Sequence, residues 1–206
     1  MNTYFISGIG TEVGKTLIAA MVVEALQADY WKPIQAGDLQ NSDTHKVKNL
    51  VSNSTSHFFE NAYALQTPMS PHAAAEIDDL QIDLANIKRP QTNNNLVIEG
   101  AGGLLVPLNE NDCIIDLMQA EDKIILVSRH YLGSINHTLL SIEALQQRGF
   151  KEIGILFNGD EHPTTESIIL QKTNAKFLGR IPELKTINKE RVVAEAEKLR
   201  TSLKAF

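Results

Sequence analysis

Short apolar runs alternate with segments of helical periodicity along this chain of 206 residues. The apolar runs, each expected to be a strand, lie at residues 4–6, 30–31, 96–98, 124–127, 153–157 and 176–178. Most are continuous rather than alternating, which is typical of parallel strands covered by helices on both faces. The pattern therefore predicts a three-layer α/β fold, in which helices on both faces flank a mostly parallel sheet.

Two segments combine helical spacing with a clear apolar face. Residues 135–148 place Leu139, Ile142 and Leu145 on one face, and Gly149 follows as a stop signal. Residues 188–203 repeat apolar side chains at the same spacing. Each pattern predicts an amphipathic helix packed against the sheet.

Two more helices are expected from signals at their first residues. Residues 15–27 continue directly from a glycine-rich loop, and Ser70 with Pro71 suits the cap and first position of a helix. The pattern is weakest between residues 45 and 95, where polar stretches predict surface loops. No repeat or linker divides the chain, so we expect residues 1–206 to form one domain.

Composition and charge exclude several classes of function. Apolar residues make up 43% and charged residues 21% of the chain, as in ordinary globular proteins. The net charge is −6 and basic residues are nowhere dense, so no nucleic acid partner is expected. No signal peptide and no membrane-spanning run is found, and no membrane partner is expected. The single cysteine, Cys113, excludes an internal disulfide and is expected to be packed, which favours a cytoplasmic location.

Residues 8–16 read GIGTEVGKT and resemble a phosphate-binding loop with altered spacing. The usual pattern G-x-x-x-x-G-K-[ST] would place its first glycine at Ile9, whereas here Gly8 makes the loop one residue longer. The loop lies between a strand and a helix, the context in which backbone N–H groups can face phosphates. Gly14, Lys15 and Thr16 supply the final glycine, the phosphate-binding lysine and the metal-binding hydroxyl. The alternative is a glycine turn that merely opens a helix.

Two carboxylates are candidates to complete a Mg²⁺ site with Thr16. Glu99 ends an apolar strand at a glycine-rich loop, where a carboxylate is costly to bury unless a cation or donors receive it. Its alternative reading is a helix-capping or solvent-facing side chain. Asp43 is the second candidate, although the sequence Asn41-Ser42-Asp43 equally suits a helix cap.

Lys32 is a candidate for the reacting groups. Pro33 should end the strand at residues 30–31, which leaves Lys32 at the edge of the sheet beside the glycine loop. A second cation there could stabilise charge on a transferred phosphoryl group. A lone surface lysine is the alternative.

Several stretches in this order resemble the dethiobiotin synthetase family. They are GTEVGKT, KPIQAG, EGAGG, LGSINHT, SPHAAA and GRIPEL, and they span residues 3 to about 184. Members of this family have the longer glycine loop, so Ile9 is not a defect. The resemblance implies an enzyme of the penultimate step of biotin biosynthesis, an ATP- and Mg²⁺-dependent cyclo-ligase. It would join 7,8-diaminononanoate and CO₂ through a carbamate and a carbamic–phosphoric anhydride, giving dethiobiotin, ADP and phosphate.

The resemblance also implies roles for individual residues. Lys15, Lys32 and Thr11 would be catalytic, and Thr16, Asp43 and Glu99 would bind Mg²⁺. The nucleotide would contact Glu12, Val13, Gly14, Lys15, Thr16, Leu17, Asn158 and Pro182, the last two near the adenine. The substrate would contact Lys32, Ala36, Gly133, Ser134 and Asn136, the last three across a dimer interface, so a homodimer is expected.

The chain departs from the family pattern in two places. Ala36 stands where many members have Ser or Thr, which puts one hydrogen bond near the carbamate in doubt. The segment at residues 128–131 is more polar than usual, so that Arg129, His130 or Tyr131 either lines the substrate tail or lies on the surface.

Three other classes share parts of this pattern. Partitioning and septum-positioning ATPases carry a second lysine in the loop, at the position that Gly10 occupies here. Corrinoid amidotransferases need a glutaminase domain for which residues 1–206 leave no room. A non-catalytic nucleotide-binding scaffold would not need Lys32, Asp43 and Glu99 together with Lys15 and Thr16.

Overall fold

The protein is built on a parallel sheet whose strands come from distant parts of the chain. The structure, a computed structural model, describes residues 1–206. Its strands are β1 (Thr3–Gly8), β2 (Asp29–Trp31), β3 (Ile34–Ala36), β4 (Phe58–Phe59), β5 (Tyr63–Leu65), β6 (Leu96–Gly103), β7 (Lys123–Arg129), β8 (Ile153–Asn158) and β9 (Lys176–Ile181). Its helices are α1 (Lys15–Leu26), α2 (Asp43–Leu50), α3 (Pro71–Ile77), α4 (Ser134–Gln147), α5 (Pro163–Lys172) and α6 (Lys189–Ala205).

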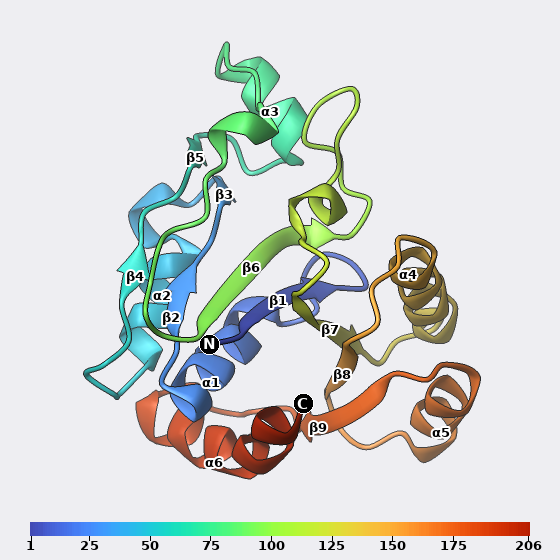
Figure 1. The fold of residues 1–206 in the computed structure, drawn as a ribbon. Coiled ribbons are helices and arrows are strands. Elements are labelled where there is room, and N and C mark those ends of the chain that lie inside the picture. The colour runs from blue at the N-terminus through green and yellow to red at the C-terminus, as the bar shows by residue number, and fades with distance from the viewer.

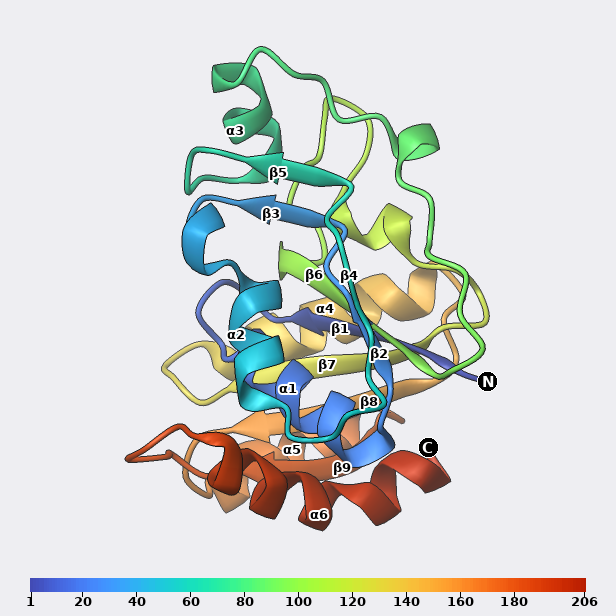
Figure 2. The ribbon, with the colours of Figure 1, turned by 90° about the vertical axis from the view of Figure 1, so that its left-hand side faces the viewer.

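The main sheet has seven strands in the order β4-β2-β6-β1-β7-β8-β9 (Figure 1). All its neighbouring strands are parallel. A separate pair, β3 with β5, stands beyond the carboxyl ends of β2 and β6 (Figure 2). The predicted α/β fold is therefore confirmed, and the six predicted strands all lie in the main sheet.

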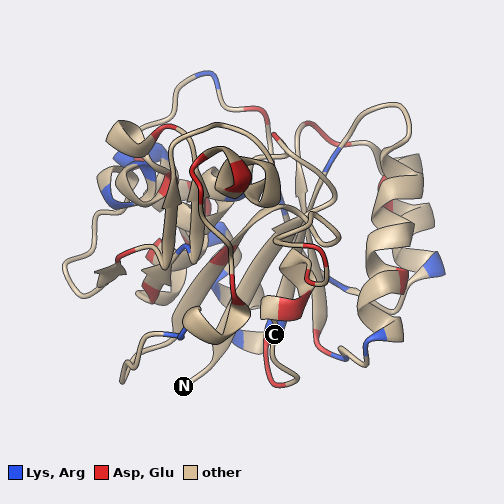
Figure 3. Ribbon diagram, turned by 90° about the horizontal axis from the view of Figure 1, so that it is seen from above, with Lys and Arg blue, Asp and Glu red and all other residues tan.

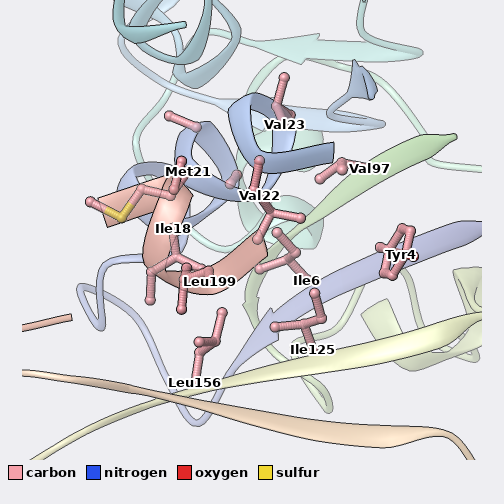
Figure 4. Close-up of a cluster of buried hydrophobic side chains, with 14 of the residues drawn as sticks. Tyr4, Ile6, Ile18, Met21, Val22, Val23, Val97, Ile125, Leu156 and Leu199 are labelled. Atoms are coloured by element: carbon pink, nitrogen blue, oxygen red, sulfur yellow. The ribbon is translucent and has the colours of Figure 1, made fainter. Parts of the chain in front are cut away.

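Two apolar cores fill the space on either side of the sheet. Helices α1 and α6 cover one face, where Ile18, Val22 and Leu199 pack against Ile6 and Leu156 (Figure 4). On the other face, α4 and α5 contribute Ile142, Leu145 and Ile169 to a second core. Helices on both faces bury the central strands completely, which explains their continuous apolar runs.

The sequence pattern missed or misplaced several elements. α2 and α5 were not predicted as helices, and β3 was not predicted as a strand. The short strands β4 and β5 lie between residues 45 and 95, the region expected to consist of surface loops. β6 continues to Gly103 instead of ending at Glu99, and its glycines allow close packing there. A Cβ at Gly100 would lie 3.0 Å from Ile114 and 3.1 Å from Phe5.

The helix boundaries agree with expectation to within about two residues. Ser70 is the residue before α3 and Pro71 its first residue, as predicted, but the Ser70 side chain makes no capping hydrogen bond. No helix is long and apolar enough to cross a membrane. Basic and acidic positions are interspersed over the elements rather than separated (Figure 3).

Candidate active site

A cavity of about 930 Å³ opens at the carboxyl ends of β1, β2 and β6. Ligands of open parallel sheets bind at this edge. Ten of the residues singled out in the sequence line the cavity: Thr11, Glu12, Gly14, Lys15, Thr16, Leu17, Lys32, Ala36, Asp43 and Glu99. The structure therefore brings together the glycine loop, the candidate metal ligands and Lys32.

The glycine loop ends at Gly14, which precedes α1 in a left-handed conformation with φ 94°. A Cβ there would lie 2.2 Å from the Asn158 amide nitrogen, so only glycine fits. The first turn of α1 has no side-chain cap and no acidic residue. Its backbone N–H groups are thus available to an anion in the cavity.

Lys15 extends back over the loop, where its Nζ donates to the Gly10 carbonyl oxygen at 3.0 Å. Burial lowers the pKa of Lys15 to about 8, against the opposing effect of the Glu99 carboxylate. An anionic phosphate beside Nζ would supply the counter-charge that this buried lysine lacks.

Lys32 forms ion pairs with both candidate metal-binding carboxylates. Its Nζ lies 2.7 Å from Asp43 Oδ2 and 3.1 Å from Glu99 Oε1. Lys32 is 4% exposed and Glu99 is 1% exposed, so the surface-lysine and solvent-facing alternatives are wrong. Alternation along β2 and β6 explains this meeting, because Tyr30, Lys32 and Glu99 all point to the α1 face of the sheet.

The charges in this cluster stabilise one another. Burial alone would lower the pKa of Lys32, but the Glu99 and Asp43 carboxylates raise it above its usual value. Burial alone would raise the pKa of Asp43, but the Lys32 charge and hydrogen bond lower it. Lys32 is therefore held as a cation and Asp43 as an anion.

The helix-cap reading of residues 41–43 is confirmed, and the Asp43 carboxylate also lines the cavity. Ser42 is the N-cap of α2, its hydroxyl accepting from the His45 N–H at 3.4 Å, and Asp43 is the first helical residue. The Asp43 backbone N–H donates to Gln35 Oε1 at 3.2 Å, which orients its side chain toward Lys32. The helix start thus places the carboxylate in the cavity.

The oxygen donors around Lys32 fit a magnesium ion. The Thr16 hydroxyl donates to Glu99 Oε1 at 2.9 Å, and the Asp43 carboxylate lies on the other side of Lys32. Mg²⁺ prefers oxygen ligands and usually takes one or two carboxylates together with waters and substrate phosphates. No group of three or more His, Cys, Asp or Glu residues is arranged to hold a metal by itself.

The residues expected near the adenine lie behind the glycine loop, outside the cavity lining. Asn158 ends β8, and its Nδ2 donates to the Val13 carbonyl oxygen at 2.8 Å. Pro182 follows β9, whose last residue accepts a hydrogen bond at 2.8 Å from the Gly159 N–H just after β8. Val13 itself is buried in the core.

The start of α4 does not reach the cavity of the same chain. Gly133 and Asn136 are exposed and Ser134 is buried, and none of them lines the cavity. The polar segment before α4 makes other contacts. Arg129 donates to the Glu12 carbonyl oxygen at 3.3 Å, and Tyr131 is hydrogen-bonded to His137 at 2.8 Å.

His130 is paired with Glu166 at 3.0 Å instead of lining a substrate site. Neither Arg129 nor Tyr131 lines the cavity, so the surface reading of this segment agrees with the structure of the single chain.

Cys113 is half-buried, and burial raises the pKa of its thiol, as suits a packed cysteine.

Sequence reasoning missed several residues of the site, including Lys46, which lines the cavity and lies 3.6 Å from Asp43. Tyr30 donates its hydroxyl to Glu99 Oε2 at 2.8 Å, although nothing in the sequence links β2 to β6. The Gln35 side chain accepts a hydrogen bond from the Asp43 N–H and donates one to the Gly37 carbonyl oxygen. A polar residue between apolar neighbours in the short β3 could have marked it as a site residue. Ile187 lines the cavity from the loop before α6.

Comparisons with known proteins agree with this geometry. The family model described as "AAA domain" matches residues 2–191. A Christiangramia forsetii protein named "ATP-dependent dethiobiotin synthetase BioD" is 65% identical over 98% of both chains. A Cytophaga hutchinsonii protein of the same name is 48% identical over 97% of both chains.

Solved structures with little sequence identity share the fold. The "MinC:MinD cell division protein complex" of Aquifex aeolicus has a TM-score of 0.61 at 13% identity, covering 100% of this chain and 95% of that chain. A plasmid partition protein of Borrelia burgdorferi has a TM-score of 0.59 at 16% identity, covering 100% and 99%. These likenesses show the fold alone. The two close relatives go further, and with their near-complete coverage the chain belongs to the dethiobiotin synthetase family, whose members are ATP-dependent ligases.

Proposed function

We propose that the protein closes the cyclic urea of dethiobiotin from 7,8-diaminononanoate, CO₂ and ATP, releasing ADP and phosphate. The observation that carries the proposal is the meeting of two buried lysines and two carboxylates in one cavity with the glycine loop. The names of the close relatives support the product.

The reaction divides into three steps with balanced bonds. One substrate amine adds to CO₂ and loses a proton, which gives a carbamate. A carbamate oxygen attacks the γ-phosphorus, the bond to ADP breaks, and a carbamic–phosphoric anhydride forms. The second amine then attacks the carbamate carbon and phosphate leaves, which closes the five-membered urea ring. Phosphorylation is needed because the carbamate oxygen is otherwise a poor leaving group.

The lysines are proposed to act on the charge of the transferred group. Lys15 would bind the β- and γ-phosphates from the glycine loop, and Lys32 would bind the carbamate and the γ-phosphate. Thr11 would contact the carbamate from the same loop. Most catalysis of phosphoryl transfer comes from positioning and charge stabilisation, which such fixed cations provide.

Thr16, Asp43 and Glu99 would hold Mg²⁺. The ion would neutralise charge on the β- and γ-phosphates when it is bound. Lys32 lies between the two carboxylates, and its charge offsets part of the cost of burying them.

The remaining nucleotide contacts would come from Glu12, Val13, Gly14 and Leu17 around the phosphates and ribose. Asn158 and Pro182 would bind the adenine behind the loop. Ala36 would face the carbamate without the hydroxyl common in the family, so it would leave one hydrogen bond unmade.

We further propose a homodimer in which the start of α4 completes the partner's substrate site through Gly133, Ser134 and Asn136. A helix N-terminus attracts a carboxylate such as that of the substrate. Leu132 beside it is fully exposed, and Ile135 and Leu140 are exposed on the same helix. Apolar side chains gathered at one helix suit burial in an interface. Analytical ultracentrifugation would test this, and Leu132→Glu is expected to give monomers.

Residues 1–206 are proposed to act as one domain in the cytoplasm. The test of the function is phosphate release from Mg-ATP and bicarbonate, with and without 7,8-diaminononanoate, while mass spectrometry follows the cyclic urea. Equal amounts of phosphate and product, formed only with the diamine, are expected. Phosphate release that ignores the diamine would instead indicate a switch ATPase.

A further inference from the structure

Tyr30 is a buried residue directly behind the proposed metal site. Its side chain is 0% exposed and does not line the cavity, yet its hydroxyl donates to Glu99 Oε2 at 2.8 Å. Its ring lies 6.1 Å from that of Phe58, in the apolar layer between the sheet and the helices. A phenylalanine would fill the same apolar space, so the hydroxyl serves the contact with Glu99.

The two oxygens of Glu99 have different surroundings. Oε2 accepts only from the Tyr30 hydroxyl, on the buried side. Oε1 accepts from the Thr16 hydroxyl at 2.9 Å and from Lys32 Nζ at 3.1 Å, and both of those residues line the cavity. The carboxylate therefore presents one oxygen to the cavity and keeps the other engaged behind it.

The Tyr30 hydroxyl is buried behind the cavity with Glu99 Oε2 as its partner. Lys32 and Thr16 instead line the cavity, where a ligand can displace them from Oε1.

We propose that Tyr30 is a positioning residue that keeps Glu99 a one-oxygen metal ligand and thereby favours Mg²⁺ over Ca²⁺. The proposal rests on the function proposed above, in which Glu99 is a ligand of the metal. It assigns to Tyr30 a role in the choice of the ion rather than in the reaction itself.

The chemistry of the two ions gives the reason. Mg²⁺ requires near-octahedral geometry with short bonds of about 2.0–2.1 Å, which suits single carboxylate oxygens and waters. Ca²⁺ accepts more ligands at about 2.3–2.6 Å and is often chelated by both oxygens of a carboxylate. Holding Oε2 with a buried hydroxyl removes the chelating option, and partners that orient metal ligands in this way commonly alter affinity by about 10- to 100-fold.

The test compares Tyr30→Phe with Glu99→Gln and with Tyr4→Phe. Tyr4 is the matched control, because it is a tyrosine on β1 that is 2% exposed and contacts no candidate ligand. Electron paramagnetic resonance would measure Mn²⁺ binding, as the stand-in for Mg²⁺, to each protein with a non-hydrolysable ATP analogue. Displacement by Ca²⁺ would then give the ratio of the two affinities.

In Tyr30→Phe we expect Mn²⁺ binding to weaken about tenfold while Ca²⁺ binding weakens less, so that Ca²⁺ displaces Mn²⁺ at lower concentration. Glu99→Gln should weaken the binding of both ions, and Tyr4→Phe should leave the binding of both unchanged. Unchanged or equally weakened binding in Tyr30→Phe would overturn the proposal. Unchanged Mn²⁺ binding in Glu99→Gln would instead overturn the metal assignment of the proposed function.

A second measurement does not depend on the folding of a variant. Infrared difference spectra of the unsubstituted protein with ¹³C-labelled glutamate would compare the carboxylate stretches with and without Mn²⁺ and the nucleotide analogue. A wide separation of the two stretches, as in one-oxygen coordination, is expected. A narrow separation, as in chelation, would contradict the role of Tyr30.

Discussion

Two buried carboxylates, Glu99 and Glu166, lie in charged clusters that differ in whether a ligand can reach them from a cavity. Glu99 meets Lys32 and Asp43 at the wall of a cavity. Glu166, on α5, accepts two bonds from Arg180 at 2.6 and 2.8 Å, one from the His162 N–H at 3.2 Å, and is paired with His130. The second cluster does not line the cavity beside Glu99.

The difference separates a functional charge cluster from a structural one. The planar guanidinium of Arg180 is bound at two points, whereas the Lys32 ammonium is a compact point charge between two carboxylates. Lys46 also pairs with Asp43, at 3.6 Å, but Lys32, Asp43 and Glu99 all line the cavity, so a metal ion or a substrate can reach them. Around Glu166 every acceptor is occupied, which ties α5 to the ends of β7 and β9.

The largest expected effect would come from Lys32→Ala. We expect turnover to fall at least about a hundred- to a thousandfold, because a fixed cation at the transferred group is lost. Nucleotide affinity should change little, since Lys15 and the loop N–H groups remain. Steady-state kinetics would measure turnover, and calorimetric titration would measure nucleotide affinity. Lys48→Ala, at an exposed position on α2, is the control. An equal loss of nucleotide affinity would assign Lys32 to the phosphates.

Glu166→Gln should act on stability instead of on turnover. Breaking one partner of a buried ion pair costs about 3–5 kcal/mol, and we expect about 2 kcal/mol because Arg180 is 25% exposed. Urea unfolding would measure the loss. Glu161 also contacts Arg180, at 3.1 Å, but is 63% exposed, so Glu161→Gln should cost no more than about 0.5 kcal/mol. Turnover lost in Glu166→Gln at unchanged stability would break the distinction between the clusters.

The stabilisation by Glu166 should disappear in acid. Burial would raise the pKa of Glu166, but the hydrogen bonds from Arg180, the His162 N–H and His130 lower it below its usual value. A lowered folded-state pKa stabilises the fold above the unfolded-state value, and that stabilisation is lost as the pH falls through the folded-state value. The difference in unfolding free energy between the native protein and Glu166→Gln should thus be constant near neutrality and shrink below about pH 4.5. A difference that grows in acid would contradict this.

Ala36→Ser should have the smallest effect. A hydroxyl at this position would restore one hydrogen bond near the carbamate, worth about 1 kcal/mol, so kcat/KM for the diamine should rise by about fivefold at most. Ala101→Ser, elsewhere in the cavity lining, is the control and should give no gain. A gain shared by both variants would mean that polarity of the cavity, and not one contact, is responsible.

The sequence predicted the parts of the fold that depend on local signals. The continuous apolar runs identified six of the seven strands of the main sheet, and the order of glycine, lysine and threonine located the start of α1. The helix α5 was missed because its buried Thr165 and Glu166 interrupt the apolar pattern that marks a helix. The pairs β3–β5 and β2–β4 were missed because strands of two or three residues carry too short a pattern.

The candidate site was predictable where chemistry shows in single residues and not where it depends on strand order. Lys15 and Thr16 follow a glycine at the start of a helix, and Lys32 and Glu99 stand beside proline or glycine at strand ends. Tyr30 could not be found, because its contact with Glu99 requires that β2 lie next to β6. The same holds for Glu166, whose partners lie just after β7 and within β9.

The central place of β1 has a consequence for synthesis of the chain. Residues 3–8 pair with residues 96–103 on one side and residues 123–127 on the other. Contacts so distant in sequence form slowly, because a long loop must close before they contribute. The glycine loop is therefore translated first but can acquire its final shape only after β7 has left the ribosome. A nascent chain that ends before β7 carries the complete glycine-loop sequence, but it lacks a strand that the folded loop needs.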